Sequence, residues 1–587
     1  MSERNYLEIM HQYCKDVQTG VRIAGKFEKL AVKRFLNDLK RQENDHDFPY
    51  SFSEERLNHV CSFIENLHHW KGALARKHFI LDPWQVFVVG NIFGWEDEDG
   101  IRRFTDAYVE ISKKNGKSTL AAAIGLYMLC GDGEAGAEVY AAAANYDQAK
   151  IVWQDAKQMV LLNAELRATF GIETTQYEIR STTGNDNSIF RPIATDKEGS
   201  KDGKNVHCAI LDEIHAHKDS ETYDIMADGV IARREPLVLG ITTAGSNKIG
   251  VCWRERCKVV DILYGKDHLE RYFGIIFTID KGDDWRNPDV WPKANPSMGV
   301  AFDTNYLQGK YKKIKTAAEE SRFRQKSLNE WVQGADSWIA SSEWEMLADP
   351  SVTEDQFKGC ISFGGLDLAS KMDLAGYVKW YPKLIDGRVH WYIFARQYIN
   401  EHVVNQRRQT DGQKRPDEYL DWVEDEYLIE TPGNVTNFGR IFTDIVESHA
   451  QSPFYEIGFD PWNASQFAQD LISRDIEAIE VRQQVNPLSF GMRWIEELIR
   501  DGRIHHDGNP VLQWCMCNIV VKEDANTHIF PRKPDKARKI DAAVAAIIGA
   551  TRAMLWDKLD VFDLVPGEGD ADWDIDDYLN NFVAVRR

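Results

Sequence analysis

The stretch Val109-Glu-Ile-Ser-Lys-Lys-Asn-Gly-Lys-Ser-Thr119 joins a short apolar run to an Ala-rich segment and decides the fold of the N-terminal half. A tight turn between a strand and a helix aims backbone N–H groups at phosphate oxygens, and the helix N-terminus adds partial positive charge. In such a loop Lys117 reaches the β- and γ-phosphates, and the Ser118 hydroxyl helps to hold Mg²⁺. The full pattern has Gly where Ile111 stands, so this interpretation depends on a matching acidic strand. The residues expected around the phosphates are Asn115, Gly116, Lys117, Ser118 and Thr119.

A second apolar run, over residues 205–213, ends in two acidic residues. The carboxyl end of a buried parallel strand faces the ligand crevice, so Asp212 is placed to hold Mg²⁺ and Glu213 to polarise the attacking water. A third run ends in Thr242 and Thr243, the position at which helicase-like ATPases sense the γ-phosphate. The three elements, in this order, predict an ATP site with Mg²⁺.

The bulk composition fits an ordinary globular protein of two or more domains, because 587 residues exceed one core. No apolar run reaches the roughly 18–20 residues of a membrane span, the N-terminus lacks a secretory signal, and the nine cysteines form no Cys-x-x-Cys pair. We therefore expect a cytoplasmic protein without a membrane partner. The net charge of −21 argues against passive coating of nucleic acid. Any DNA contact has to come from basic patches, for which the candidates are residues 310–315, 322–326 and 532–539.

The order of patterns along the chain predicts two α/β domains. Short apolar strands alternate with helices from Ala107 onward, which is typical of a parallel sheet. Gln85, just before this core, has an amide that can read adenine. The predicted divisions are an N-terminal helical region at 1–75, an ATPase domain at 76–345, a linker at 346–357, a second α/β domain at 358–555 and an acidic tail at 556–587.

Three acidic residues in the second predicted domain form a second chemical centre. Asp367 and Asp460 end apolar strands, and Asp541 begins an apolar helix. Strand ends and an adjacent helix can bring carboxylates to one sheet edge, where cations must neutralise them. Hard oxygen ligands select Mg²⁺ or Mn²⁺, and two such ions can cleave a phosphodiester. The order of elements around these residues therefore predicts a two-metal nuclease site.

With both centres in place, nearly the whole chain resembles the large terminase subunit of tailed bacteriophages. The similar segments are Leu81–Gln85, Ser112–Ser118, Ala143–Ala149, Leu211–His215, Ile241–Gly245, Gly365–Ala369, Gly458–Pro461 and Lys539–Ala542. The resemblance implies an N-terminal P-loop (ASCE-type) ATPase with a parallel sheet, followed by an RNase H-like α/β nuclease. It assigns Gln85 to adenine, Lys117 and Ser118 to phosphate and Mg²⁺, Asp212 and Glu213 to Mg²⁺ and catalysis, Thr242 and Thr243 to coupling, and Asp367, Asp460 and Asp541 to the nuclease metals.

The family usually has a basic residue, often Arg, early in the phosphate loop, and Lys113 takes that place here. Lysine lacks the bidentate fork of arginine, so two alternatives stay open for the finger that reaches the γ-phosphate. It is either Lys113 itself or a residue of a neighbouring subunit, for which Arg233 and Arg234 are candidates.

The resemblance implies an ATP-driven motor subunit that moves double-stranded viral DNA into the procapsid and cuts concatemeric DNA. It also implies a ring of subunits, a pentamer, on the portal protein, site recognition by a small terminase subunit, and a place in the host cytoplasm with transient attachment to the procapsid. Two rival functions are a helicase or repair-type ATPase–nuclease, and a portal-docking subunit with an inert nuclease centre. The acidic tail is either a docking segment or a solvating tail.

Overall fold

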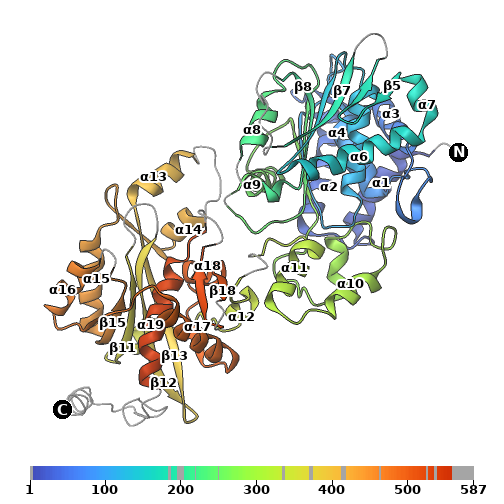
Figure 1. Cartoon of the computed structure of the whole chain (residues 1–587). Helices are drawn as coiled ribbons and strands as arrows, with labels where there is room; N and C mark the ends of the chain where they lie inside the picture. The colour runs from blue at the N-terminus through green and yellow to red at the C-terminus, as the bar shows by residue number, and fades with distance from the viewer. Residues whose placement is uncertain are drawn as a thin grey trace. The chain divides into compact units, whose positions relative to one another are not determined.

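The computed structural model describes most of the chain as two compact units, Met1–Val332 and Gln333–Arg587 (Figure 1). The described residues are 4–182, 187–194, 204–217, 220–248, 250–332, 337–368, 374–410, 418–461, 464–523, 527–533 and 538–557. Almost all of the acidic tail predicted at 556–587 lies outside them.

Four helices form the N-terminal part of the first unit, and the first three lie within the helical region predicted at 1–75. They are α1 (Tyr6–Thr19), α2 (Lys26–Asn44), α3 (Glu54–Glu65) and α4 (Pro83–Gly94). The hydroxyl of Ser53 caps α3 by accepting a hydrogen bond from the backbone N–H of Arg56. Every residue of α4 from Trp84 to Gly94 is buried, so this helix is part of the core.

The first unit is built on an eight-stranded sheet, in the order β10-β3-β9-β8-β4-β7-β6-β5. The six strands from β10 to β7 are parallel, as the sequence pattern predicts, and β6 and β5 extend the sheet antiparallel. Figure 1 shows helices packed around this sheet. The strands are β3 (Asp106–Glu110), β4 (Glu138–Ala143), β5 (Ile172–Thr174), β6 (Ile179–Ser181), β7 (Ser188–Ala194), β8 (Val206–Asp212), β9 (Leu237–Thr242) and β10 (Tyr272–Ile276).

The helices that follow β3 and β4 are α5 (Lys117–Leu126) and α6 (Tyr146–Leu162). Gly125 of α5 lies so close to the sheet that a Cβ there would be 2.8 Å from side-chain atoms of Ile210 and Phe190. The phosphate loop is therefore anchored between a central strand and a helix packed tightly on the sheet.

A small helical part of the first unit follows β10 and contains α10 (Thr304–Tyr311) and α11 (Ala317–Leu328). It has its own apolar cluster, which includes Trp291 and Phe323. Asn329 ends α11 in the left-handed conformation, with φ of 54°. Its side chain accepts a hydrogen bond from the backbone N–H of Ala244, just after β9, and donates one to the carbonyl of Phe277. These bonds fix the end of α11 beside the sheet.

The second unit has a sheet in the order β14-β13-β12-β11-β15-β16, with β17 paired to β13. Strand β12 pairs antiparallel with both β11 and β13, whereas β15 runs parallel to β11. The strands are β11 (Ser362–Asp367), β12 (Ala375–Ile385), β13 (Arg388–Asn400), β14 (Leu428–Thr431), β15 (Phe454–Phe459), β16 (Ala478–Glu480) and β17 (Ile504–His506).

The two units divide after Val332, upstream of the linker predicted at 346–357. Ile339 and Trp344, which lie before that linker, pack in the core of the second unit, and Trp344 stacks on His506 with ring centroids 4.7 Å apart. The turn-prone residues 348–351 therefore form a loop within the second unit.

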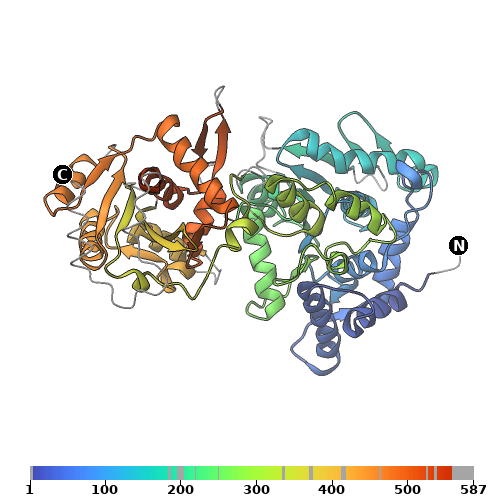
Figure 2. The ribbon, with the colours of Figure 1, turned by 90° about the horizontal axis from the view of Figure 1, so that it is seen from below.

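Helix α19 (Asp541–Asp557) packs against β11 and is seen nearly end-on within the second unit in Figure 2. The helix runs antiparallel to the strand, because Trp556 contacts Phe363 whereas Ala545 and Gly549 lie against Gly365. The first residue of α19 is therefore at the carboxyl end of β11. Glycine at position 365 permits this close approach, since a Cβ there would be 1.9 Å from the carbonyl oxygen of Ala545.

Candidate active sites

The phosphate loop of the first unit is a tight turn held by buried amides. Gly116 has φ of 80° and immediately precedes α5, so glycine suits this left-handed position. The side-chain amide of Asn115 donates to the hydroxyl of Ser112, 2.8 Å away, and its oxygen accepts from the backbone N–H of Ser297 at 3.0 Å. These contacts assign Asn115 to shaping the loop. Thr119 lies on the first turn of α5.

The loop and the end of β8 bring together the residues predicted to act on the nucleotide. Lys117 Nζ lies 2.7 Å from Glu213 Oε1, and the hydroxyl of Ser118 donates to Asp212 Oδ2 at 3.3 Å. Glu213 follows the strand in a left-handed conformation, with φ of 50°, which turns its backbone away from the strand direction. A cationic, two acidic and one hydroxyl group thus converge at the carboxyl edge of the sheet.

The two neighbouring acids titrate in opposite directions. Burial raises the pKa of Asp212 to about 6, although the nearby Lys117 ammonium opposes the shift. Burial also disfavours the charge of Glu213, but the Lys117 ammonium outweighs it and lowers the pKa of Glu213 to about 2. At neutral pH Glu213 is therefore fully ionised and paired, the state required of a group that accepts a proton or orients water.

His215 and Lys326 complete this centre, although the sequence assigned no role to His215 and offered Lys326 only as part of a candidate DNA-contact patch. Lys326 Nζ donates to His215 Nε2 at 3.0 Å, while His215 Nδ1 lies 3.1 Å from Glu213 Oε2. Burial, together with the charge of Lys326, lowers the pKa of His215 to about 3, so the ring is neutral. His215 stood in a quoted segment and Lys326 in a basic patch, but only the fold places them beside Glu213.

The carboxyl end of β9 carries the two predicted hydroxyls, since Thr242 ends the strand and Thr243 follows it. Thr243 donates to Glu213 Oε2 at 3.4 Å, and Thr242 Oγ1 lies 3.1 Å from His215 Nδ1. Both threonines are buried. A movement of either threonine would therefore alter a hydrogen bond to Glu213 or to His215.

Of the residues considered for the finger, Lys113 lies at the centre. Its Nζ is 3.7 Å from Glu213 Oε1, and its side chain is 45% exposed, so it is free to reorient. Arg233 is engaged within its own unit, where it donates to Glu134 at 3.0 Å and to the carbonyl of Gly136 at 2.8 Å. Arg234 donates to the carbonyl of Asp99. Arg233 thus holds the loop that contains Glu134 and Gly136 in place.

Gln85 lies next to the phosphate loop, because its amide nitrogen is 3.5 Å from the point where a Cβ on Gly116 would be. It is 3% exposed, and its Oε1 accepts from the backbone N–H of Asp82 in the capping box of α4. Neighbouring Trp84 donates to the hydroxyl of Ser297. The amide oxygen of Gln85 therefore caps α4, and a contact with adenine would be a second role for this side chain.

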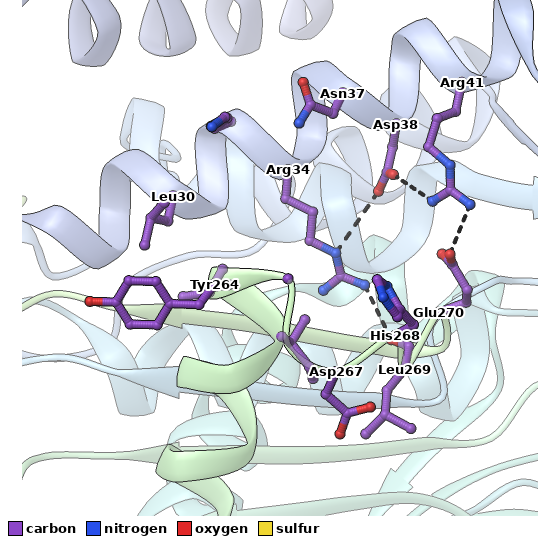
Figure 3. A pocket seen from close by; sticks show the side chains of 14 residues that line it. Leu30, Arg34, Asn37, Asp38, Arg41, Tyr264, Asp267, His268, Leu269 and Glu270 are labelled. Carbon is purple, nitrogen blue, oxygen red and sulfur yellow. Dashed lines mark hydrogen bonds and ion pairs between the residues drawn. The ribbon is translucent and has the colours of Figure 1, made fainter. Parts of the chain in front are cut away.

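A cavity of about 440 Å³ in the first unit lies between α2 and residues 262–270 (Figure 3). Arg41 pairs with Asp38 and Glu270, at 3.1 and 2.9 Å, and Arg34 donates to the backbone carbonyl of Tyr272 at 2.7 Å. Because these guanidinium groups are already engaged, we interpret the cavity lining as a clamp that fastens α2 to the edge of the sheet.

In the second unit the three predicted acids lie at one edge. Asp367 ends β11, and Asp460 directly follows β15, whose Phe459 is paired with Leu366. Asp541 begins α19, which runs back over β11 from that edge. Asp541 is buried, and Lys533 Nζ lies 3.4 Å from its Oδ1, so this position already accommodates a cation.

Within the described ranges, no three His, Cys, Asp or Glu side chains are grouped closely enough to hold a metal ion. The donor chemistry nevertheless fits hard divalent ions, because all three predicted ligands are carboxylates. The three positions share the sheet edge without forming a compact ligand set, so metal binding at Asp367, Asp460 and Asp541 stays a prediction.

The basic patches differ in what they can offer to DNA. In residues 322–326, Arg324 pairs with Glu320 and Glu330, and Lys326 contacts His215. In residues 310–315, Lys310 stacks over Tyr306. In residues 532–539 the structure describes only part of the segment, including Lys533 beside Asp541. Across the part of the chain that the structure describes, no helix is both long and apolar enough to cross a membrane.

Comparison with known proteins shows the same two-part organisation. Residues 83–259 match the family model for the ATPase domain of the terminase large subunit, and residues 266–556 match that for its endonuclease domain. Protein YmfN of Escherichia coli (strain K12) is 34% identical over 363 residues, which cover 61% of this chain and 80% of that protein. The large terminase subunit of Enterobacteria phage HK97 is 26% identical over 497 residues, 81% of this chain and 91% of that protein.

The crystal structure of the HK97 large terminase covers 85% of this chain and 99% of its own, at 24% identity and a TM-score of 0.42. Two successive family models, in the predicted order, together span most of the sequence. The chain therefore belongs to the family of terminase large subunits and is an ATPase and an endonuclease of viral DNA packaging.

Proposed function

We propose that the centre around Lys117 and Glu213 hydrolyses ATP, and that the edge formed by Asp367, Asp460 and Asp541 cuts DNA. The observation that carries the first assignment is the 2.7 Å contact between Lys117 and Glu213. It brings the lysine of the phosphate loop and the acid that ends β8 into direct contact. Family membership supports the second assignment, together with the shared edge of the three acids.

In the ATPase reaction the residues have separable tasks. Lys117 would exchange its hydrogen bond with Glu213 for one with a phosphate oxygen, since its ammonium is the nearest cation to that acid. Glu213 then accepts a hydrogen bond from the attacking water, while His215 and Thr243 hold its second oxygen. Ser118 and Asp212 would hold Mg²⁺, which neutralises charge on the phosphates when bound. Gln85 would contact adenine, and Lys113 would reach the γ-phosphate.

In the nuclease reaction Asp367, Asp460 and Asp541 would hold Mg²⁺ or Mn²⁺. When bound, such ions activate water and stabilise the leaving oxygen of the phosphodiester. The three acids come from two neighbouring strands and the helix that covers them. Their spacing is therefore set by the packing of α19 on β11.

We further propose that the assembly follows the family pattern. A ring of subunits, a pentamer, docks on the portal protein of the procapsid in the host cytoplasm, and a small terminase subunit selects the site on double-stranded DNA. Packaging of DNA into purified procapsids tests this proposal. An ATPase and nuclease of repair type would hydrolyse ATP and cut DNA but package none.

A pair of variants tests the two separate sites in the full chain. Lys117→Ala should abolish ATP hydrolysis and leave metal-dependent DNA cleavage intact, whereas Asp541→Ala should do the reverse. Each variant is the folding control of the other, because each retains one activity. Loss of both activities from either stably folded variant would contradict the assignment of separate sites.

A further inference from the structure

Beside the proposed nuclease edge lies a surface cavity that the three acids do not account for. It has a volume of about 430 Å³ and is lined by Asp460, Pro461, Arg482, Gln483 and Gln484. The last three residues join β16 to α17 (Val485–Arg500) and are exposed. We refer to it as the Arg482 cavity.

The sheet register explains why this loop faces Asp460. β15 and β16 are parallel neighbours, and Phe459 is paired with Glu480. Asp460 and Val481 therefore leave the sheet side by side, on strands about 4.8 Å apart, and Arg482 follows one residue later. The cavity belongs to the same carboxyl edge that carries Asp367.

The side chains of Arg482 and Gln484 are hydrogen-bond donors that make no bond within the described part of the fold. Among described residues, no hydrogen bond or ion pair involves the guanidinium of Arg482. The Gln484 side chain likewise makes no cap hydrogen bond to α17, although it is at the N-cap position. By contrast, Arg493 on the same helix pairs with Glu496, and Arg552 pairs with Glu456. Exposed side chains without a partner contribute little to the stability of the fold, so stability does not explain their place around the cavity.

We propose that the Arg482 cavity binds a backbone phosphate of the DNA that the second unit cuts, next to the phosphate that is cleaved. Arginine forms bidentate hydrogen bonds with phosphate, and amide side chains are common secondary donors to DNA backbones. A chain of net charge −21 needs such a local cation to hold a polyanion. The carboxylate of Asp460, on the other wall, would repel a DNA phosphate. The divalent cation predicted at Asp460 would neutralise this charge and so allow the phosphate to bind. This inference rests on the proposed nuclease function.

The test compares three variants of the full chain by the rate of cutting of linear duplex DNA with Mn²⁺ over a range of salt concentrations. Arg482→Gln should raise the KM for DNA about tenfold with little change in kcat, and should lower the salt dependence of KM by about one phosphate contact. Arg482→Lys, which keeps the charge but loses the fork, should recover part of the loss. Arg500→Gln is the matched control: it is exposed, lies at the far end of the same helix, and should match the wild type.

Two further measurements separate the possible failures. The ATPase rate of every variant checks the fold and should be unchanged. Asp541→Ala tests the nuclease site itself: if that variant still cuts DNA, the proposed function fails and this inference falls with it. If Asp541→Ala is inactive but Arg482→Gln equals the wild type, or if Arg500→Gln loses as much as Arg482→Gln, the cavity does not bind DNA while the nuclease assignment stands.

Discussion

The contact between β11 and α19 predicts a severe effect of Gly365→Ala. The new Cβ would be 1.9 Å from the carbonyl oxygen of Ala545 and 2.3 Å from the backbone nitrogen of Gly549. Both are backbone atoms, so no side chain can rotate away. An ordinary contact begins at 3.4 Å, which requires α19 to retreat by about 1.5 Å. Overpacking of this kind costs about 1–3 kcal/mol. It also displaces Asp541 from Asp367, and errors of about 1 Å in a catalytic arrangement can cost a hundredfold in rate.

The assay is metal-dependent DNA cleavage by the full chain, measured with ATP hydrolysis and thermal unfolding of the same preparation. We expect cleavage to fall by about a hundredfold and the second unit to melt earlier, while ATP hydrolysis is retained. Gly309→Ala is the matched control, because a Cβ on this residue of α10 meets nothing within 4 Å. Wild-type cleavage and unchanged melting of Gly365→Ala would refute the packing argument.

Four further predictions concern the first unit. Lys326→Met should raise the pKa of His215 from about 3 toward its ordinary value, which NMR titration measures, because a neighbouring cation is removed. Asp212→Asn should stabilise the nucleotide-free protein at pH 8 by no more than about 3 kcal/mol, and less at pH 4. The reason is that burial raises the carboxyl pKa from 3.8 to about 6, so the cost to stability grows as the pH rises through that interval and is complete above it; equal gains at both pH values would contradict it. Asn329→Ala should lower the melting temperature, with a cost of about 1–3 kcal/mol, because it leaves the buried N–H of Ala244 unsatisfied. Arg233→Gln should reduce stability but not the ATPase rate of the folded protein, since its guanidinium is engaged locally; a large loss of ATPase rate would restore it as a finger candidate.

Much of the secondary structure could be predicted, because it follows from the pattern of apolar and polar residues over short stretches of the chain. Strands such as Leu237–Thr242 and helices such as Tyr146–Leu162 alternate from Ala107 onward, as expected from the sequence, since a buried strand is uniformly apolar and a helix is amphipathic. The alternation of strands and helices also gave the parallel sheet. The order of the strands in the sheet could not be predicted, because it depends on the position at which each helical crossover returns the chain to the sheet. The position of the break between the units could not be predicted either, since Trp344 falls within the ATPase domain predicted at 76–345, and only its stacking on His506 assigns it to the second unit.

The electrostatics of the ATPase centre show a different limit. The sequence places Lys117 and Glu213 on the right elements because each sits in a motif with its chain neighbours. The neutral state of His215, by contrast, depends on burial and on a charge that comes from elsewhere in the chain, because Lys326 lies on α11, more than a hundred residues later. A basic residue in a run of basic residues looks like a solvated surface. It becomes part of a catalytic centre because two contacts hold it there: Asn329, three residues on, bonds to Ala244, just after β9, and the backbone N–H of Lys113 donates to the carbonyl of Lys326. Asn329 thus fixes the end of α11 and, with it, the position of Lys326 beside His215. Any movement of α11 during the ATPase cycle would therefore change the surroundings of His215, which contacts the catalytic acid.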